Sequence, residues 1–414
     1  MAIAELPPLS FPTWRFILVN NKDMSRIEEL KGASEGNIEI VLDQPGQVSF
    51  NFPMNDPTAD AIEPYKTGIL AERFNYRDTL IRHLSGEGGA VWDKMWSGYV
   101  LPVKQDWTND KLQVSAIGWI NRLTKRLSRD KLIFTGQDDG DIILSILQHA
   151  NNLTGTTAEK GVGVSTATMA DTFVIHWPAG SSPNTSTFMK YGGKLPNEGV
   201  GGATAYVASA GRNITVEKYT SLYQPIQDLI NLENGCDVVV DPVTRALNIH
   251  RKYSRDNDDI VLGFRAGIVN NVSEFDVQID ADQKANYFLV QGAPSATPQY
   301  AADATDMDEV GPIEEVISIG NVTDTAVLLA YAGAELLVRK DGVVTYGITP
   351  MQYIPNSGIP EPFIDYRVGD YVSVRAHHPT FTNIVTPAGI RIFGMKVSLD
   401  NNKNEKLSQL QVAP

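Results

Sequence analysis

The chain has 414 residues, enough for roughly two to four domains, and its 42% hydrophobic content is ordinary for a folded globular protein. Its net charge is −14, and the sequence has no basic tail and no Lys/Arg cluster. A surface that grips nucleic acid needs concentrated cations to neutralise phosphates. The composition therefore argues against tight or sequence-specific DNA or RNA binding, whereas an acidic wall along which DNA slides stays compatible with it.

A single cysteine, Cys236, lies in the apolar run 236–240. It excludes an intrachain disulfide and a cysteine-based metal cluster, and we expect a buried, inert thiol. No apolar run approaches the roughly 20 residues that span a bilayer. The first residues lack the charged and apolar regions of a signal peptide. We therefore expect no membrane-spanning segment, synthesis in the cytoplasm, and any later exit as part of an assembled particle.

Strand patterns dominate the first 125 residues. Polar and apolar residues alternate over 37–42 and again over 47–52, and the turn sequence Asp43-Gln44-Pro45-Gly46 separates them. This pattern predicts a hairpin with one apolar face. Further strands are predicted at 69–76, 79–84, 94–103 and 111–117. Together these strands predict a small antiparallel barrel or sandwich.

Three helices are predicted from apolar residues at helical spacing. They begin at 138, 225 and 323 and end near 151, 235 and 342, respectively. We interpret their apolar stripes as core positions. The stripe residues are Ile142, Ile143, Ile146, Leu147, Ile226, Leu229, Ile230, Leu328, Leu329, Leu336 and Leu337.

Residues 152–212 differ from the rest because they are rich in Gly, Ser, Thr and Ala and contain few large apolar residues. We interpret this stretch as an inserted, loop-rich subdomain. A glycine-rich nucleotide loop is the sharper alternative for its glycine-dense part. It is not favoured, because no Lys-Ser/Thr pair ends the loop and no strand–loop–helix pattern surrounds it.

Two segments far apart in the sequence resemble each other. In each, a basic residue and a turn glycine open a strand, a second glycine lies inside a later strand, and a polar turn leads to a strand that begins Lys-Leu. Glycines inside strands mark bulges or close backbone approach. We interpret the echo as duplication of one small barrel, with chance likeness between hairpins as the alternative. The matching glycines are Gly68 and Gly98 in the early copy and Gly369 and Gly394 in the late copy.

These patterns predict an α+β chain that is mainly β. We expect a first tube-like antiparallel β-barrel over 1–127, a linking helical α/β domain over 128–151 and 213–260, and the loop-rich insertion over 152–212. A second tube-like β-barrel is expected over 261–414, with a helix over 324–341. Three copies of such a chain would present six similar units around one axis, which closed rotational symmetry favours.

The order and spacing of the motifs resemble the baseplate hub and minor tail proteins of siphophages, particularly those of actinobacterial phages. The resemblance covers nearly the whole chain, although each motif alone is weak. The motifs are 42–46, 48–53, 64–69, Trp96-Ser97-Gly98-Tyr99-Val100, 116–120, Arg122-Leu123-Thr124-Lys125-Arg126, 226–230, Glu233-Asn234-Gly235-Cys236-Asp237, 247–250, 286–292 and Gly369-Asp370-Tyr371-Val372.

The resemblance implies a structural protein of the virion tail tip and not an enzyme. It implies a homotrimeric, pseudo-hexameric ring that lies below a distal tail protein ring, passes DNA through its lumen, and contacts the tape measure protein and central fibre or tip proteins. The lumen face is expected to be polar or acidic. Because the chain stops at Pro414, soon after the second barrel, we expect no added hydrolase, and host attachment through receptor binding falls to partners.

No catalytic, cofactor-binding or metal-binding residues are predicted. His377 and His378 are adjacent, so on a strand they would point to opposite faces and could not both bind one ion with Asp370. Ser97 lacks the Gly-x-Ser-x-Gly elbow of hydrolases. The acidic runs 256–259 and 303–309 are interpreted as solvated turns, with a calcium site in either as the alternative hypothesis.

Two other classes of function stay open. A virion-associated cell-wall hydrolase would need a cleft with paired carboxylates or a metal. A carbohydrate-binding host-adhesion module would expose aromatic rings on one sheet face. Four tryptophans occur in the first barrel, but three lie within strand patterns and are more simply explained as core or interface. These four are Trp92, Trp96, Trp107 and Trp119.

Overall fold

The fold is taken from a computed structural model, and every structural statement below concerns the residues it describes. These are 12–85, 89–137, 139–151, 212–231, 236–245, 247–250, 260–265, 270–280, 282, 284–319, 322–340, 343–353, 357–377, 384–385 and 389–413.

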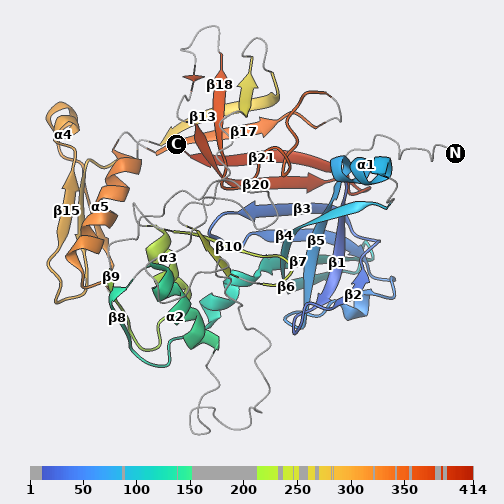
Figure 1. Cartoon of the computed structure of the whole chain (residues 1–414), viewed down its shortest axis with the longest axis horizontal. Helices are drawn as coiled ribbons and strands as arrows, with labels where there is room; N and C mark the ends of the chain where they lie inside the picture. Colours follow the sequence, from blue (N-terminus) through green and yellow to red (C-terminus); the bar gives the residue numbers. More distant parts are fainter. Residues whose placement is uncertain are drawn as a thin grey trace.

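A largely antiparallel sheet forms the body of the molecule (Figure 1). Its main path runs β13-β17-β21-β20-β3-β4-β7-β6-β5-β1-β2, and β18 joins this path through β20. Its strands are β1 (Trp14–Asn20), β2 (Arg26–Glu29), β3 (Ser34–Val41), β4 (Gln47–Pro53), β5 (Thr67–Asn75), β6 (Val91–Asp106), β7 (Lys111–Gly118), β12 (Val261–Phe264), β13 (Val272–Asp280), β17 (Val343–Pro350), β18 (Tyr371–Ala376), β19 (Ile384–Val385), β20 (Ile390–Leu399) and β21 (Glu405–Ala413).

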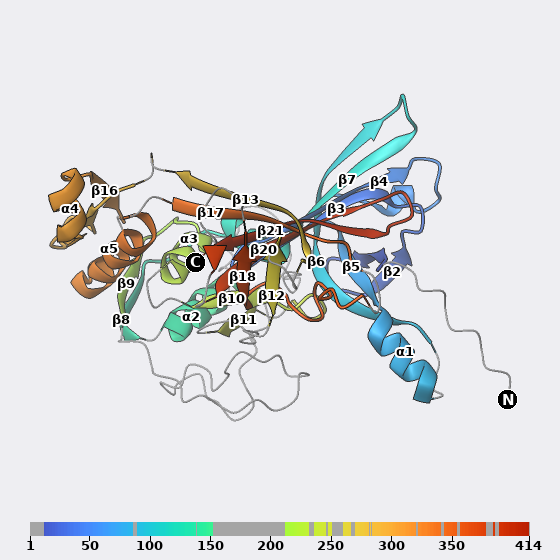
Figure 2. The same cartoon turned by 90° about the horizontal axis from the view of Figure 1, so that it is seen from above.

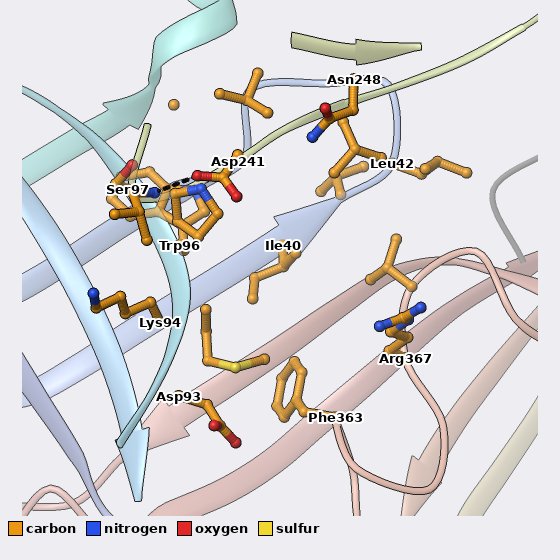
Figure 3. A pocket seen from close by; sticks show the side chains of 18 of the residues that line it. Ile40, Leu42, Asp93, Lys94, Trp96, Ser97, Asp241, Asn248, Phe363 and Arg367 are labelled. Carbon is orange, nitrogen blue, oxygen red and sulfur yellow. Dashed lines mark hydrogen bonds between the residues drawn. The ribbon is translucent and has the colours of Figure 1, made fainter. Parts of the chain in front are cut away.

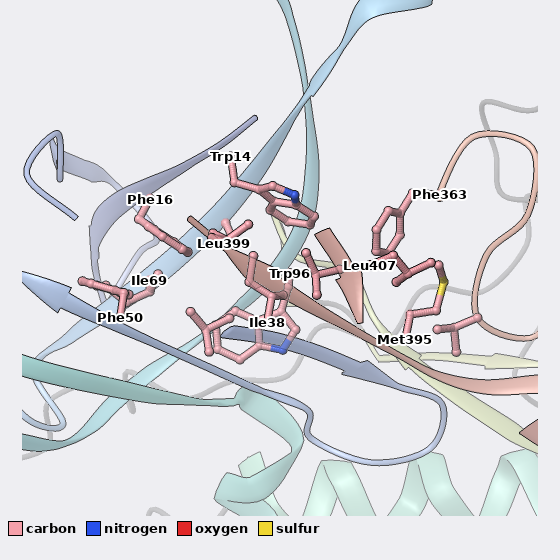
Figure 4. Close-up of a cluster of buried hydrophobic side chains, with 14 of the residues drawn as sticks. Trp14, Phe16, Ile38, Phe50, Ile69, Trp96, Phe363, Met395, Leu399 and Leu407 are labelled. Atoms are coloured by element: carbon pink, nitrogen blue, oxygen red, sulfur yellow. The ribbon is translucent and has the colours of Figure 1, made fainter. Parts of the chain in front are cut away.

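The pairing of β3 with β20 joins strands from the two ends of the sequence. Ile38 lies opposite Val397 and Ile40 lies opposite Met395 in this pair. Burial alternates along β4 and over residues 35–38 of β3, which confirms the predicted hairpin with its single apolar face. The resulting core contains side chains from both halves (Figure 4), for example Trp14, whose ring packs edge-on against Phe363 at 5.7 Å between centroids.

A second core lies beside the first and holds helices together with short sheets. Its buried residues come from the helices α2, α3 and α5 and from the strands that accompany them. The elements are η2 (Trp119–Lys125), β8 (Leu132–Gln137), α2 (Asp139–Asn151), β9 (Arg212–Val216), α3 (Tyr223–Ile230), β10 (Asp237–Val240), β11 (Leu247–His250), β14 (Tyr287–Gln291), β15 (Gln299–Ala302), α4 (Ala304–Val310), β16 (Glu314–Ser318) and α5 (Thr325–Arg339).

The observed class is α+β and mainly β, as the sequence predicted. The closed barrels and the domain boundaries stay predictions. The structure adds that β14 and α5 share the second core with the region predicted as the linking domain, although their residues fall within the range predicted for the second barrel. The first core likewise draws on both predicted barrel regions.

All three predicted helices are present within the described residues. The helix predicted from 225 begins two residues earlier, at Tyr223, and ends at Ile230. Asp324 caps α5 by accepting a hydrogen bond from the backbone N–H of Ala326 at 2.8 Å. The prediction that the apolar stripe of α5 is core was partly wrong, however, because Leu328 is buried whereas Leu329 and Leu337 are exposed. The helix is therefore apolar on more than its core-facing side.

The strand predicted over 79–84 is wrong, because these residues lie in the helix α1 (Tyr76–Ser85). Leu80, Ile81 and Leu84 are spaced by one, three and four residues, which suits a helix as well as a strand. The local signal that decides is Asn75, whose side-chain oxygen accepts from the backbone N–H of Asp78 at 2.9 Å and satisfies an end of the helix. The helix stands off the body (Figure 2).

The two echoing segments have the same order of strand pairing. β5 pairs with β6, which pairs with β7, and β18 pairs with β20, which pairs with β21. Gly394 lies where the β20–β21 register shifts, and a Cβ at Gly98 would lie 2.2 Å from the carbonyl oxygen of Ile117. Both strand glycines therefore mark a bulge or a close approach, as predicted. Duplication itself stays an interpretation.

No helix within the described residues is long and apolar enough to cross a membrane. The predicted insertion over 152–212 lies outside the described residues except for Arg212, the first residue of β9. The ends predicted for the second and third helices, Gly235 and Gly342, also lie outside them.

Candidate functional site

From β13 to β6 the main sheet turns one apolar face to the core, and its other face is largely polar. Across β20, β3, β4 and β7 the polar face is formed by cross-strand neighbours in register: Ser398 opposite Asn37, Asn37 opposite Ser49, and Ser49 opposite Ser115. A second row joins Lys396, Glu39 and Gln47 in the same way. We call this surface, from β13 to β6, the polar face.

Side-chain hydrogen bonds tie the strands of the polar face together. Glu39 accepts from the amide of Gln47 at 2.8 Å and from the amide of Gln411 at 3.2 Å. Glu35 accepts from the amide of Asn51 at 2.7 Å and lies 3.6 Å from the ammonium of Lys111. These contacts join β21, β3, β4 and β7 through their side chains. The surface is therefore hydrophilic, with amides and carboxylates that bind one another.

Charges of both signs alternate along the polar face. The register places acidic residues on β13 at one side and a mixture of lysines and acids elsewhere, so the face has almost no net charge and mostly presents amides and hydroxyls. The charged residues on it are Glu274, Asp276, Lys396, Lys406, Glu35, Glu39, Lys111, Lys104 and Asp106.

A cavity of about 750 Å³ opens beside β6, between the β10–β11 hairpin and the loop that precedes β18 (Figure 3). Ile40, Trp96 and Phe363 line it with apolar surface, and Asp93 and Arg367 add polar groups. Burial raises the pKa of Asp93, although a hydrogen bond from Asn75 opposes the shift. Among the described residues that line the cavity there is no histidine or cysteine.

A buried ion cluster connects β5 to the C-terminal half. The guanidinium of Arg73 contacts Glu361 at 2.9 Å and Glu405 at 2.6 Å, and all three side chains are buried. Trp14 donates its indole N–H to Glu405 at 2.8 Å. Although burial lowers it, Glu405 and Glu361 raise the pKa of Arg73 overall. We call these residues the Arg73 cluster.

A second cluster of one arginine and two carboxylates lies between β3, β10 and β20. Arg391 pairs with Asp237, and Asp43 accepts from the backbone N–H of Val238 at 2.6 Å. Burial, and then the neighbouring Asp237, raise the pKa of Asp43 to about 7, against the opposing effects of Val238 and Arg391. We call these residues the Asp43 cluster. No local sequence pattern indicates the Arg73 cluster or the Asp43 cluster, because the members of each lie far apart in the chain.

The structure places the residues weighed earlier for chemistry apart from one another. No group of three or more His, Cys, Asp or Glu side chains suited to a metal occurs among the described residues. Asp370 is buried and accepts from the backbone N–H of Arg367 at 3.0 Å, and the Ser97 hydroxyl accepts from the indole of Trp119 at 2.8 Å. Cys236 is buried, as predicted.

The acidic run 303–309 is largely a helix and not a loop. Asp303 caps α4 and pairs with Lys340, and Asp306 pairs with Lys284. These carboxylates are therefore engaged with lysines and with backbone N–H groups. The other run, 256–259, and His378 lie outside the described residues.

The four tryptophans do not form an exposed aromatic row. Trp96 and Trp119 are buried, and the guanidinium of Arg15 covers the ring of Trp92 at 4.3 Å. Only Trp107 is largely exposed, at the tip of the hairpin between β6 and β7, which projects from the body (Figure 2).

Comparison with known proteins identifies the fold. No protein-family model and no curated protein matches this sequence. The structure is similar to a tail protein from Neisseria meningitidis MC58, with a TM-score of 0.57 at 12% identity over 97% of both chains. It is also similar to the 43 kDa tail protein of prophage MuSo2 from Shewanella oneidensis, with a TM-score of 0.52 at 13% identity over 96% of this chain and 97% of that one. This chain therefore has the fold of these tail proteins over nearly its full length.

Proposed function

We propose that the protein is a structural baseplate hub, or minor tail protein, of a tailed phage of the siphovirus type, located at the tail tip of the virion. The observation that carries the proposal is the polar face, which continues across both halves of a chain with the fold of phage tail proteins. A face of amides, hydroxyls and balanced charge would let a polyanion pass, because it offers no concentrated cations to hold phosphates.

The width of the polar face is compatible with a three-membered ring. Eight strands, from β13 to β6, contribute to it. Three copies would supply 24 strands at about 4.8 Å each, or roughly 115 Å around a closed wall. Such a wall has a diameter of about 37 Å between backbones and roughly 27 Å after side chains of about 5 Å on each side. That lumen admits a DNA duplex.

In this proposal the protein is a scaffold and has no catalytic role. The homotrimer would follow a distal tail protein ring, continue the DNA channel from the tape measure protein, and hold central fibre or tip proteins. The fully buried cores and the β3–β20 pairing support such a role, because a rigid wall must not open when neighbours pull on it.

Mass and shape in solution test the proposal. We expect light scattering and negative-stain microscopy to show a trimeric ring with a central hole, alone or with the tail protein encoded next to it. A compact monomer in both samples would contradict the proposed ring.

The cavity with Asp93 favours a cell-wall hydrolase as the second candidate function. A cell-wall degradation assay with no activity would exclude it.

The assignment of the lumen is tested separately. Replacing Asn37, Ser49 and Ser115 together by Lys adds three cations to the centre of the polar face without changing the buried face. We expect rings of normal mass that retain duplex DNA in a salt-dependent manner. The same number of lysines at exposed positions outside the face, such as Thr108, Glu28 and Asp60, should leave DNA retention unchanged.

A further inference from the structure

The helix α5 exposes apolar side chains that no element in the described part of the chain covers. Leu329 and Leu337, two turns apart on one side of the helix, are 50% and 67% exposed. Gly333 lies midway between Leu329 and Leu337 on the same side of the helix, so a second helix can approach closely there. The opposite side of α5 is buried through Val327, Leu328 and Ala332. An exposed apolar stripe of this length on a folded chain indicates an interaction surface.

A second exposed apolar helix face occurs on α1. Ile81 and Leu84, three residues apart, are 57% and 75% exposed. The helix is fixed to the body on its other side, where Thr79 accepts a hydrogen bond from the backbone N–H of Val91 at 2.9 Å. α1 and α5 lie at opposite ends of the long axis of the molecule (Figure 1), so one chain cannot bring them together.

The two helices also differ in charge. The segment 284–340, which carries α5, has eight acidic and three basic residues, a net charge of −5. Asp308, Glu309 and Glu314 are exposed within it. α1 has two arginines and one aspartate, a net charge of +1, and Arg82 is exposed beside Ile81. Opposite charge favours α1 against α5, whereas two copies of the α5 segment would repel each other.

We propose that α1 of one copy packs its Ile81 and Leu84 against the α5 stripe of the next copy. This inference rests on the proposed ring and names the surfaces that close it. The contact is head-to-tail, as a three-membered ring requires, because a contact between identical patches closes after two copies. Apolar side chains form its centre, and Arg82 faces the acidic segment at its rim.

Cross-linking between two variants tests the pairing. One sample carries Leu84→Cys, the other Leu337→Cys, and the buried Cys236 leaves the introduced thiols as the reactive ones. After mixing, a short bismaleimide should join one variant to the other and neither variant to itself. A chain with both changes should give a covalent trimer. If light scattering shows trimers but only Leu337→Cys dimers or no cross-links form, this pairing is overturned while the ring stands.

A single substitution provides the second test. Leu84→Glu places an acid against the acidic segment, and we expect the trimer fraction to fall at least tenfold. Trp107→Glu is the matched control, because Trp107 is also 75% exposed but lies at the tip of the β6–β7 hairpin, and its trimer fraction should be unchanged. Equal trimer fractions in all three proteins would overturn the pairing. A wild-type chain that stays monomeric with every neighbour would overturn the proposed ring as well.

Discussion

The Arg73 cluster and the Asp43 cluster contain the same groups, one arginine and two carboxylates, and yet solvate their charges differently. Arg73 contacts both of its carboxylates directly, and Trp14 adds a hydrogen bond to one of them. Arg391 pairs with Asp237 and donates to the carbonyl oxygen of Gly369, and Asp43 accepts from the backbone N–H of Val238. In the second cluster, burial and then the neighbouring Asp237 raise the pKa of Asp43 to about 7. A buried carboxyl that faces a second carboxylate is therefore protonated more easily than one in water.

Removing Arg73 should destabilise the Arg73 cluster, in which one guanidinium contacts both carboxylates. Arg73→Met keeps the length of the side chain but leaves Glu361 and Glu405 buried without their cation. We expect a loss of about 3–5 kcal/mol in the free energy of unfolding, because an uncompensated buried charge is strongly destabilising. Urea denaturation at pH 7 measures it. A loss below 1 kcal/mol would show that the two carboxylates find other partners.

Replacing Asp43 by a neutral residue should remove the pH dependence that this carboxyl gives to the stability of the chain. Because its folded pKa of about 7 is above the ordinary value of 3.8, the folded chain holds a proton that the unfolded chain releases between these pH values. Its contribution to stability is therefore greatest below about pH 4 and is lost as the pH rises through about 7. Asn suits the positive φ of 64° and can still accept from Val238.

We expect Asp43→Asn to equal the wild type near pH 4 and to exceed it at pH 8 by roughly 2–4 kcal/mol. Thermal unfolding from pH 4 to pH 8 checks the sign. A difference that does not change with pH would mean that Asp43 is ionised in the folded chain throughout this range.

The indole of Trp14 should account for part of the stability of the Arg73 cluster. Trp14→Phe keeps an aromatic ring against Phe363 but removes the hydrogen bond to Glu405. We expect a loss of about 1–3 kcal/mol, the range for a charged group that loses a buried partner. In the background of Arg73→Met the same change should have a different effect, because the residues act on one carboxylate. Additive losses would argue against a coupled cluster.

An exposed ion pair should contribute least to the free energy of unfolding. Lys131 lies 2.7 Å from Glu217, and both side chains are about half exposed. Lys131→Met should change the free energy of unfolding by less than about 0.5 kcal/mol, because solvent screens such pairs. A larger loss, measured by the same urea denaturation, would mean that burial is not what separates the clusters from surface pairs.

Local patterns predicted most of the secondary structure, and they also indicated which side of a strand is polar. The alternation of Asn37 and Glu39 with Ile38 marks one polar and one apolar side on β3. It could not reveal that β3 pairs with β20, since no local pattern carries information about a partner some 350 residues away. The members of both charged clusters are also far apart in the sequence, so no local pattern indicated them. α1 was misassigned because its short apolar pattern suits either structure.

Because β3 pairs with β20, it is synthesised long before its partner strand. During translation β3 and β4 are complete long before residues 394–398 leave the ribosome, so one edge of the early sheet waits without its partner. Glu35, Asn37 and Glu39 along that edge, with Gly36 between them, discourage a neighbouring nascent chain from adding a strand there. The polar residues that would line a finished channel would thus also protect the unfinished chain from aggregation.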